Sequence, residues 1–161
     1  LASAPGTMNN FTFGNAKHQY YETISGGSGA GNGFNGTDVV QTHMTNSRLT
    51  DPEILEWRYP VRLDSYEINP NSGGQGQWHG GNGGIRKIRF LEDMTASILS
   101  NNRINAPFGA AGGDSGKCGK NYVIRANGER EELSFVASTP VHPNDVFVIE
   151  TPGGGGYGKK A

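Results

Sequence analysis

Glycine is the feature that most restricts the folds open to this chain. It fills 26 of 161 positions and gathers in runs such as residues 25–33 and 151–158. Because glycine loses so much backbone entropy in a helix or strand, both runs are predicted to be loops. Short apolar runs stand between the glycines, a pattern that favours a globular protein with many tight turns over a disordered chain.

These loops have two interpretations. Glycine is required where two backbones approach so closely that no side chain fits between them, and we favour this for residues 153–158. For residues 26–33, the sequence is equally compatible with a close-packed loop and with a flexible loop.

The stretch from residue 61 to residue 151 is predicted to be β. Apolar and polar residues alternate, with a slip near Asp64 and Ser65 that indicates a β-bulge, and Asn127-Gly128 has the pattern of a hairpin turn. The expected strands cover residues 61–68, 85–91, 95–99, 122–125, 129–133 and 146–149, the last continuously apolar and therefore buried on both faces. The predicted fold class is mainly β, a sandwich- or barrel-like architecture with glycine-rich loops.

One short helix is predicted near residues 51–58. Thr50 and Asp51 can cap its start, Pro52 suits the first helical position, and Pro60 ends it. We expect two parts in the chain. Residues 1–60 form a glycine- and asparagine-rich segment that packs on an upstream region, and residues 61–161 form a β-rich C-terminal domain.

Charge and cysteine content narrow the classes of partner. Lys and Arg number 14 and Asp and Glu number 15, interspersed, so there is no basic stripe for nucleic acid. No apolar stretch is long enough to span a membrane. The single Cys118 excludes an internal disulfide and a cysteine-based zinc cluster, and it fits a reducing, cytoplasmic compartment.

The densest polar cluster lies in residues 42–48. Arg48 could hold a carboxylate, while Thr45, Asn46 and His43 could hydrogen-bond an amide in a substrate pocket. The alternative is a loop that satisfies its own backbone and caps the helix that follows. Asn9 and Asn10 could add two amides to such a pocket, although asparagine near glycine is more often a turn residue. The residues alone leave these alternatives open, and no catalytic residue is assigned.

Nucleotide and metal sites are not expected in this segment. Residues 31–36 match the spacing of a dinucleotide-binding loop, but no clear helix follows them, and no phosphate-loop lysine follows any glycine run. The four histidines lack the spacing of a metal motif.

Several strings, taken in order, resemble the C-terminal part of the hydantoinase B/5-oxoprolinase family. The resemblance covers nearly the whole chain. The strings that carry it are residues 6–10, 13–15, 20–24, 26–30, 42–48, 50–53, 56–62, 80–84, 107–113 and 150–158.

The resemblance implies a place in a larger enzyme. Members of the family hydrolyse hydantoins or 5-oxoproline at the expense of ATP, and related carboxylases activate acetone or acetophenone. It implies that a hydantoinase A-type subunit or domain handles ATP with Mg²⁺. The B-type part then acts on the small cyclic-amide substrate, often around a divalent metal held by upstream histidines and an aspartate. Because the chain begins at Leu1, we expect a fragment that binds no cofactor itself and is inactive alone.

A different class of function is the alternative. The chain could be a free-standing β-rich binding or assembly module, for instance one that binds sugar rings through Trp57, Trp78 and the Tyr20-Tyr21 pair. A complete module closes its own core, whereas a fragment leaves apolar patches that face other residues of its parent.

Overall fold

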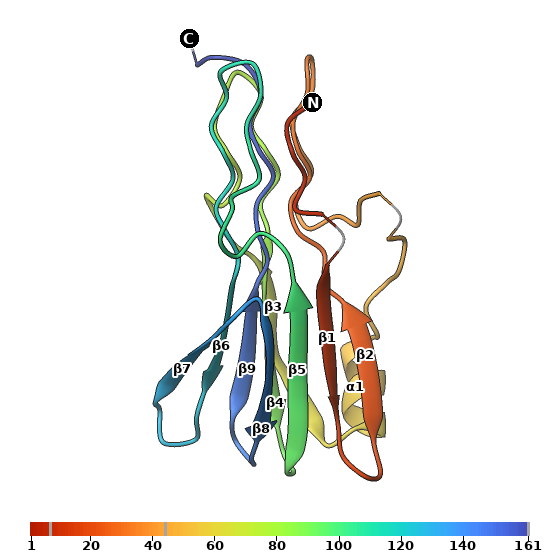
Figure 1. Cartoon of the computed structure of the whole chain (residues 1–161). Helices are drawn as coiled ribbons and strands as arrows, with labels where there is room; N and C mark the ends of the chain where they lie inside the picture. The colour runs from red at the N-terminus through yellow and green to blue at the C-terminus, as the bar shows by residue number, and fades with distance from the viewer. Residues whose placement is uncertain (7, 44, 161) are drawn as a thin grey trace.

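Two antiparallel sheets pack face to face, and a glycine-rich extension continues from one end of them (Figure 1). The structure is a computed structural model that describes residues 1–6, 8–43 and 45–160. The four-stranded sheet has the order β2-β1-β5-β8 and the five-stranded sheet the order β3-β4-β9-β6-β7. The elements are β1 (Asn9–Gly14), β2 (Gln19–Thr23), α1 (Pro52–Arg58), β3 (Val61–Ile68), β4 (Gly84–Phe90), β5 (Met94–Ser100), β6 (Lys120–Ile124), β7 (Arg130–Leu133), β8 (Val136–Val141) and β9 (Val146–Glu150). The mainly β class is confirmed, as a sandwich.

Most local predictions hold. The register of β3 against β4 shifts between Leu63 and Ser65, where the bulge was expected. Strands β6 and β7 pair as a hairpin, and Gly128 in its turn has a φ of +88°. Strand β9 lies at the centre of the five-stranded sheet with its first four residues buried, as its apolar run predicted.

Three strands were not expected. Strands β1 and β2 fall in the glycine- and asparagine-rich segment of residues 1–60, where no strand was predicted, and they pair with each other antiparallel. Strand β8 contains Pro140, which has no amide hydrogen for a ladder. The strand tolerates Pro140 because β8 is an edge strand of its sheet. The expected division of the chain near residue 60 stays a prediction, although strands from both sides of it share the four-stranded sheet.

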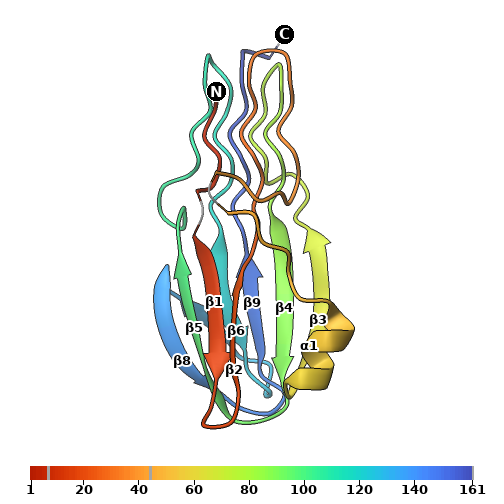
Figure 2. The same ribbon diagram turned by 90° about the vertical axis from the view of Figure 1, so that its right-hand side faces the viewer.

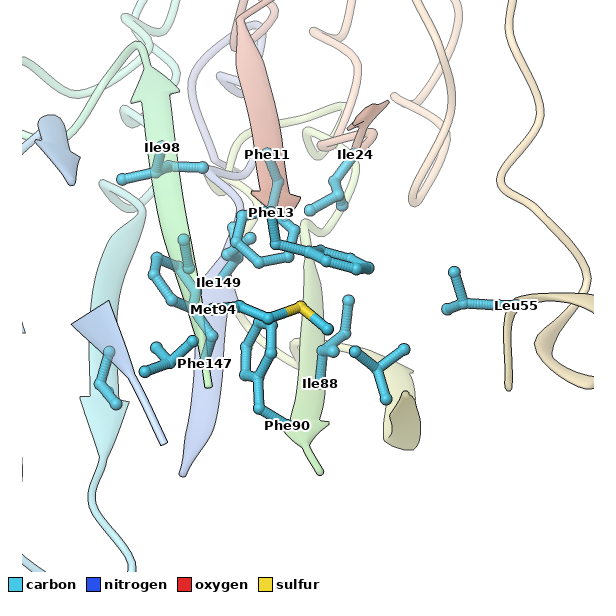
Figure 3. Close-up of a cluster of buried hydrophobic side chains, with 14 residues drawn as sticks. Phe11, Phe13, Ile24, Leu55, Ile88, Phe90, Met94, Ile98, Phe147 and Ile149 are labelled. Atoms are coloured by element: carbon cyan, nitrogen blue, oxygen red, sulfur yellow. The ribbon is translucent and has the colours of Figure 1, made fainter. Parts of the chain in front are cut away.

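The core lies between the two sheets (Figure 3). Phe11 of β1 and Phe147 of β9 meet across the layers, with ring centroids 4.6 Å apart, and Phe13 packs edge-on against Phe90 of β4 at 5.4 Å. Such aromatic pairs bury large apolar areas and fix the distance between the sheets. Helix α1 adds one fully buried side chain, Leu55.

Helix α1 forms as its sequence predicts. The side chain of Asp51 accepts a hydrogen bond from the Glu53 amide (3.0 Å), and Pro52 occupies the first turn. Among the residues that the structure describes, no helix is both long enough and apolar enough to cross a membrane.

Four glycine-rich segments and the N-terminus run side by side beyond the sandwich (Figure 2). We call them the glycine bundle, made of residues 1–5, 25–37, 72–83, 107–117 and 151–158. Its last segment shows how it is held. The amides of residues 153–156 donate in turn to Lys117, Gly81, Ser3 and Asp114.

These four amides follow a three-residue period. Residues 153 and 156 donate to the same neighbouring segment, while 154 and 155 donate to two others. A β-strand directs its hydrogen bonds to two sides only, whereas a polyproline II helix has three residues per turn and can address three neighbours. The glycine runs are therefore extended structural elements that pack on one another.

Backbone contact explains why the residues are glycine. A Cβ atom at Gly154 would lie within 3.0 Å of the Ser28 carbonyl carbon and oxygen, and one at Gly27 would meet Gly81 in the same way. Both obstacles are backbone, which cannot swing aside. The close-packed interpretation applies to residues 153–156 and, in the first run, to Gly27 and Gly29, whereas a Cβ at Gly33 would meet nothing.

Replacing Gly154 should therefore damage the fold. We expect Gly154→Ala to lower the free energy of unfolding by about 3 kcal/mol or more, the range of severe core defects. Gly33→Ala is the matched control, because a Cβ at Gly33 meets nothing within 4 Å and only its φ of +89° is strained. That strain costs about 1–2 kcal/mol. Urea unfolding measures both, and equal losses would contradict backbone packing as the reason for Gly154.

A buried ion pair joins the two layers. Arg86 of β4 donates from Nε (2.6 Å) and Nη2 (2.9 Å) to the carboxylate of Glu22 on β2, and both side chains are 2% exposed. The Tyr20 hydroxyl donates to the same carboxylate (3.0 Å), and burial raises the pKa of Tyr20 to about 12. Tyr66 lies over the guanidinium, 5.2 Å from ring centroid to carbon.

Removing one partner of this pair leaves a buried charge without compensation. We expect Glu22→Gln to lower the free energy of unfolding by about 3–5 kcal/mol. Glu132→Gln removes the partner of Arg130 from an exposed pair, and we expect a loss below about 1 kcal/mol. Thermal or urea unfolding distinguishes the two, and similar losses would refute the importance of burial.

Candidate functional site

A polar layer closes the sandwich where its strands enter the glycine bundle. Asn9, Ser100 and Asn121 occupy inward positions at the ends of β1, β5 and β6 that adjoin the bundle, and each is 2–3% exposed. Two residues further into each strand the inward side chain is apolar, because inward positions recur with period two. These apolar residues are Phe11, Ile98 and Val123.

Asn121 is the centre of a hydrogen-bond network in this layer. Its Nδ2 donates to Ser100 Oγ (2.9 Å) and to the Ser134 carbonyl (3.2 Å). Its Oδ1 accepts from Arg103 Nε (3.2 Å) and Nη2 (3.0 Å). Ser100 Oγ in turn donates to the Phe135 carbonyl (2.8 Å). Two strands and two loops are thereby fixed at one point.

Arg103 is a half-buried cation with neutral hydrogen-bond partners. Besides Asn121, it donates from Nη1 to the Asn101 carbonyl (2.6 Å). Burial lowers the pKa of Arg103 to about 10, so the group stays protonated at neutral pH. In the described part of the chain no carboxylate oxygen lies within ion-pair distance of it.

A depression of about 400 Å³ opens beside Arg103. Its lining combines one cation, several amide and carbonyl groups and two exposed apolar side chains, Ile104 and Phe135. Such a lining suits a carboxylate or amide group on a small, partly apolar molecule. The lining residues are Ser100, Asn101, Asn102, Arg103, Ile104, Asn105 and Phe135.

The expected site residues occupy two places. Asn9 lies inside the polar layer, and its buried Oδ1 has no hydrogen-bond partner among residues 1–6, 8–43 and 45–160. Asn10 points to the outer face of the sheet and accepts from Thr23 Oγ1 (3.1 Å). A buried amide oxygen without a partner costs free energy, so this oxygen does not stabilise the fold through a hydrogen bond among the described residues.

The other expected residues lie in the loop between β2 and α1. His43, Asn46 and Arg48 are exposed, and Thr45 is half-buried with its amide donating to the Thr42 carbonyl (3.2 Å). His43 has a φ of +59°, and its Nδ1 lies 3.1 Å from the Thr42 hydroxyl oxygen. Met44, in the same cluster, lies outside the described residues. Within the described ranges no hydrogen bond joins this loop to Asn9 or Asn10, so their common role stays a prediction.

Sequence reasoning missed Arg103 and Asn121. Residues 101–105 contain three asparagines and an arginine directly after a predicted strand, a polar density comparable to that of residues 42–48. That polar density was the one signal in the sequence that could have pointed to Arg103. The link from Arg103 to Asn121 spans 18 residues and has no local pattern.

Metal-binding groups do not gather in the described ranges. Across residues 1–6, 8–43 and 45–160, no group of three or more His, Cys, Asp or Glu side chains is placed to hold a metal ion. His142 pairs with Asp93 (2.7 Å) in the turn before β9, as a surface contact.

Comparison with known proteins gives a consistent result. Residues 1–160 match the family model for hydantoinase B/oxoprolinase. The chain is 46% identical to 5-oxoprolinase of Dictyostelium discoideum over 99% of its own length and 13% of that protein. It is 48% identical to 5-oxoprolinase 1 of Arabidopsis thaliana over 98% of its length and 12% of that protein. The chain thus spans only about an eighth of these relatives.

Two solved structures share the fold. A nucleotide-free acetone carboxylase aligns with a TM-score of 0.78 at 17% identity, over 96% of this chain and 26% of that one. The ATP-dependent caprolactamase from Pseudomonas jessenii aligns with a TM-score of 0.74 at 22% identity, over 98% and 30%.

The two buried asparagines allow a matched test of the polar layer. We expect Asn121→Leu to lower the free energy of unfolding by about 2–4 kcal/mol. The substitution leaves polar groups of Ser100, Ser134 and Arg103 without their hydrogen-bond partner. We expect Asn9→Leu, at the same exposure, to change it by less than about 1 kcal/mol. Urea unfolding compares them. A large loss at Asn9 would show that its amide stabilises the fold after all.

Proposed function

Because the chain belongs to the hydantoinase B/oxoprolinase family, we propose that it is the C-terminal part of an ATP-dependent cyclic-amide hydrolase. Its contribution is structural support and part of the substrate pocket. The observation that carries this proposal is the identity of 46–48% to two 5-oxoprolinases over nearly the whole of this chain. The match covers 12–13% of those proteins, so we assign the remaining steps of the reaction to other parts of the parent enzyme.

The chemistry accounts for the division of labour. An unstrained amide resists attack by water, and phosphorylation of its oxygen by ATP creates a leaving group. The second site must then exclude bulk water and admit one positioned nucleophile. We expect Mg²⁺-ATP to bind to a hydantoinase A-type subunit or domain, and a divalent metal to bind residues upstream of this segment.

This chain is suited to hold a pocket wall still. The glycine bundle ties segments that are distant in sequence through direct backbone hydrogen bonds. Rigid elements keep substrate-binding groups in productive positions better than free loops do. We propose that Arg48 neutralises a substrate carboxylate and that Asn9, Thr45, Asn46 and His43 line the pocket around the ring amide, whereas Asn10 lies on the outer face of its sheet. The exposure of Arg48, with no carboxylate within ion-pair distance in the described chain, supports its role.

The sugar-binding alternative has less support. Trp57 lies on α1 and is 83% exposed, but Trp78 belongs to the glycine bundle and packs against Tyr157 at 5.8 Å between ring centroids. Tyr20 directs its hydroxyl to the buried carboxylate of Glu22. These aromatic side chains belong to separate elements and do not form one platform.

Arg48 provides the test of the proposal in the full-length enzyme. We expect Arg48→Ala to reduce kcat/KM for the cyclic amide about ten- to a hundred-fold, mainly through KM, because one charge-assisted hydrogen bond is lost. Arg58→Ala, in the exposed last turn of α1, is the control and should leave both constants unchanged. Steady-state kinetics with the cyclic amide and ATP measures the difference. A normal KM in Arg48→Ala would remove Arg48 from the pocket.

A further inference from the structure

The outer face of the four-stranded sheet carries no charged side chain. Alternation along each strand places three residues outward on each of the four strands. We call this the uncharged sheet face. Its residues are Asn10, Thr12 and Gly14 on β1, Gln19, Tyr21 and Thr23 on β2, Thr95, Ser97 and Leu99 on β5, and Val136, Ser138 and Pro140 on β8.

The opposite face of the sandwich carries charged side chains around an apolar cluster of Tyr122, Val146 and Val148. The chain holds 29 Lys, Arg, Asp and Glu residues, 14 basic and 15 acidic, so the absence of charge on one face does not follow from composition. The outward positions of the five-stranded sheet include Lys87, Arg89, Lys120, Arg130, Glu132 and Glu150. A solvent-facing β-sheet normally looks like this second face.

Apolar side chains stand exposed on the uncharged sheet face. Tyr21, Leu99 and Val136 are 59%, 42% and 53% exposed, and all three line one depression in the face. Two shallow depressions of about 400 and 330 Å³ lie in the face, which is therefore uneven enough to receive side chains. Contiguous exposed apolar surface of this kind marks contact sites.

We propose that the uncharged sheet face is covered by another part of the same longer hydantoinase B-type chain. Depletion of charge with retention of aromatic and apolar residues is the composition of an interface centre. The solved relatives contain much additional chain, since this segment covers 26–30% of them, so a covering element of the same polypeptide is available. The covering surface must itself be uncharged, with apolar side chains for the depressions and hydrogen-bonding groups for Thr12, Ser97 and Ser138.

This inference rests on the proposed function only in requiring the parent chain. It does not depend on the substrate or on catalysis. The face could instead be covered by a second copy of this segment or by an A-type partner, and the experiment distinguishes these two occupants from the parent chain.

Cysteine labelling in the full-length B-type subunit tests the inference. In a Cys118→Ser background, Thr12→Cys probes the uncharged sheet face, and Lys120→Cys probes an exposed position on the opposite sheet. We expect the Thr12→Cys thiol to react with maleimide at least about 50-fold more slowly in the native subunit than in urea, because labelling then requires local opening. The Lys120→Cys thiol should differ by less than about 5-fold, as an open surface position.

Each outcome decides the point. Fast labelling at Thr12→Cys, or equal protection at Lys120→Cys, would overturn the inference. Protection that appears only after the A-type partner is added, or that vanishes on dilution to monomers, would assign the face to that partner or to a second copy and would also overturn it. ATP-dependent amide hydrolysis, measured on the same samples, reports the proposed function separately, so protection without hydrolysis retains the inference and rejects only that function.

Discussion

Direct contact between backbones in the glycine bundle is the constraint on which the rest of the structure depends. Residues 153–156 donate hydrogen bonds to three other segments within four residues, which is possible only if those segments approach without intervening side chains. The bundle brings residues 1–5, 72–83 and 107–117 together, and the strands that precede or follow them are aligned by it. The sandwich and the bundle are therefore one continuous object, in which the chain runs from the bundle directly into β4 and from β9 directly into the bundle.

The polar layer follows from this junction. An apolar core is made of side chains from two facing layers. It therefore ends where the sequence becomes glycine-rich and the backbones of neighbouring segments come into direct contact. Polar residues at the last inward positions then satisfy the amides and carbonyls of the turning chain, as Asn121 does for the loops that hold Ser134 and Arg103. The Glu22–Arg86 pair lies between the sheets as well and is held by two charge-assisted hydrogen bonds, so it joins the layers without leaving a charge unpaired.

The sequence indicated what local chemistry determines and missed what distant contacts determine. The bulge in β3, the β6–β7 hairpin, the buried β9 and the cap of α1 depend on neighbouring residues, and all were predicted. Strands β1 and β2 escaped notice because glycine and asparagine around them outweighed the alternation of Phe11 and Phe13. The partner of Gly154 is Ser28, 126 residues away, and nothing local indicates it. Asn9 was named for its amide, and its buried, unpartnered oxygen became visible only in the fold.

The two faces of the sandwich assign different tasks to one small domain. A charged outer face on the five-stranded sheet suits contact with water, whereas the uncharged sheet face suits burial, and the polar layer lies between the sheets at the end where the bundle begins. A domain of this kind gains precision for a pocket beside it because none of its parts moves independently: shifting Arg103 requires breaking its bonds to Asn121, and shifting the bundle requires breaking backbone bonds to several segments at once. The abundance of glycine, which in isolation implies flexibility, here allows close packing, because glycines such as Gly27 and Gly154 lack the side chain that would keep two backbones apart.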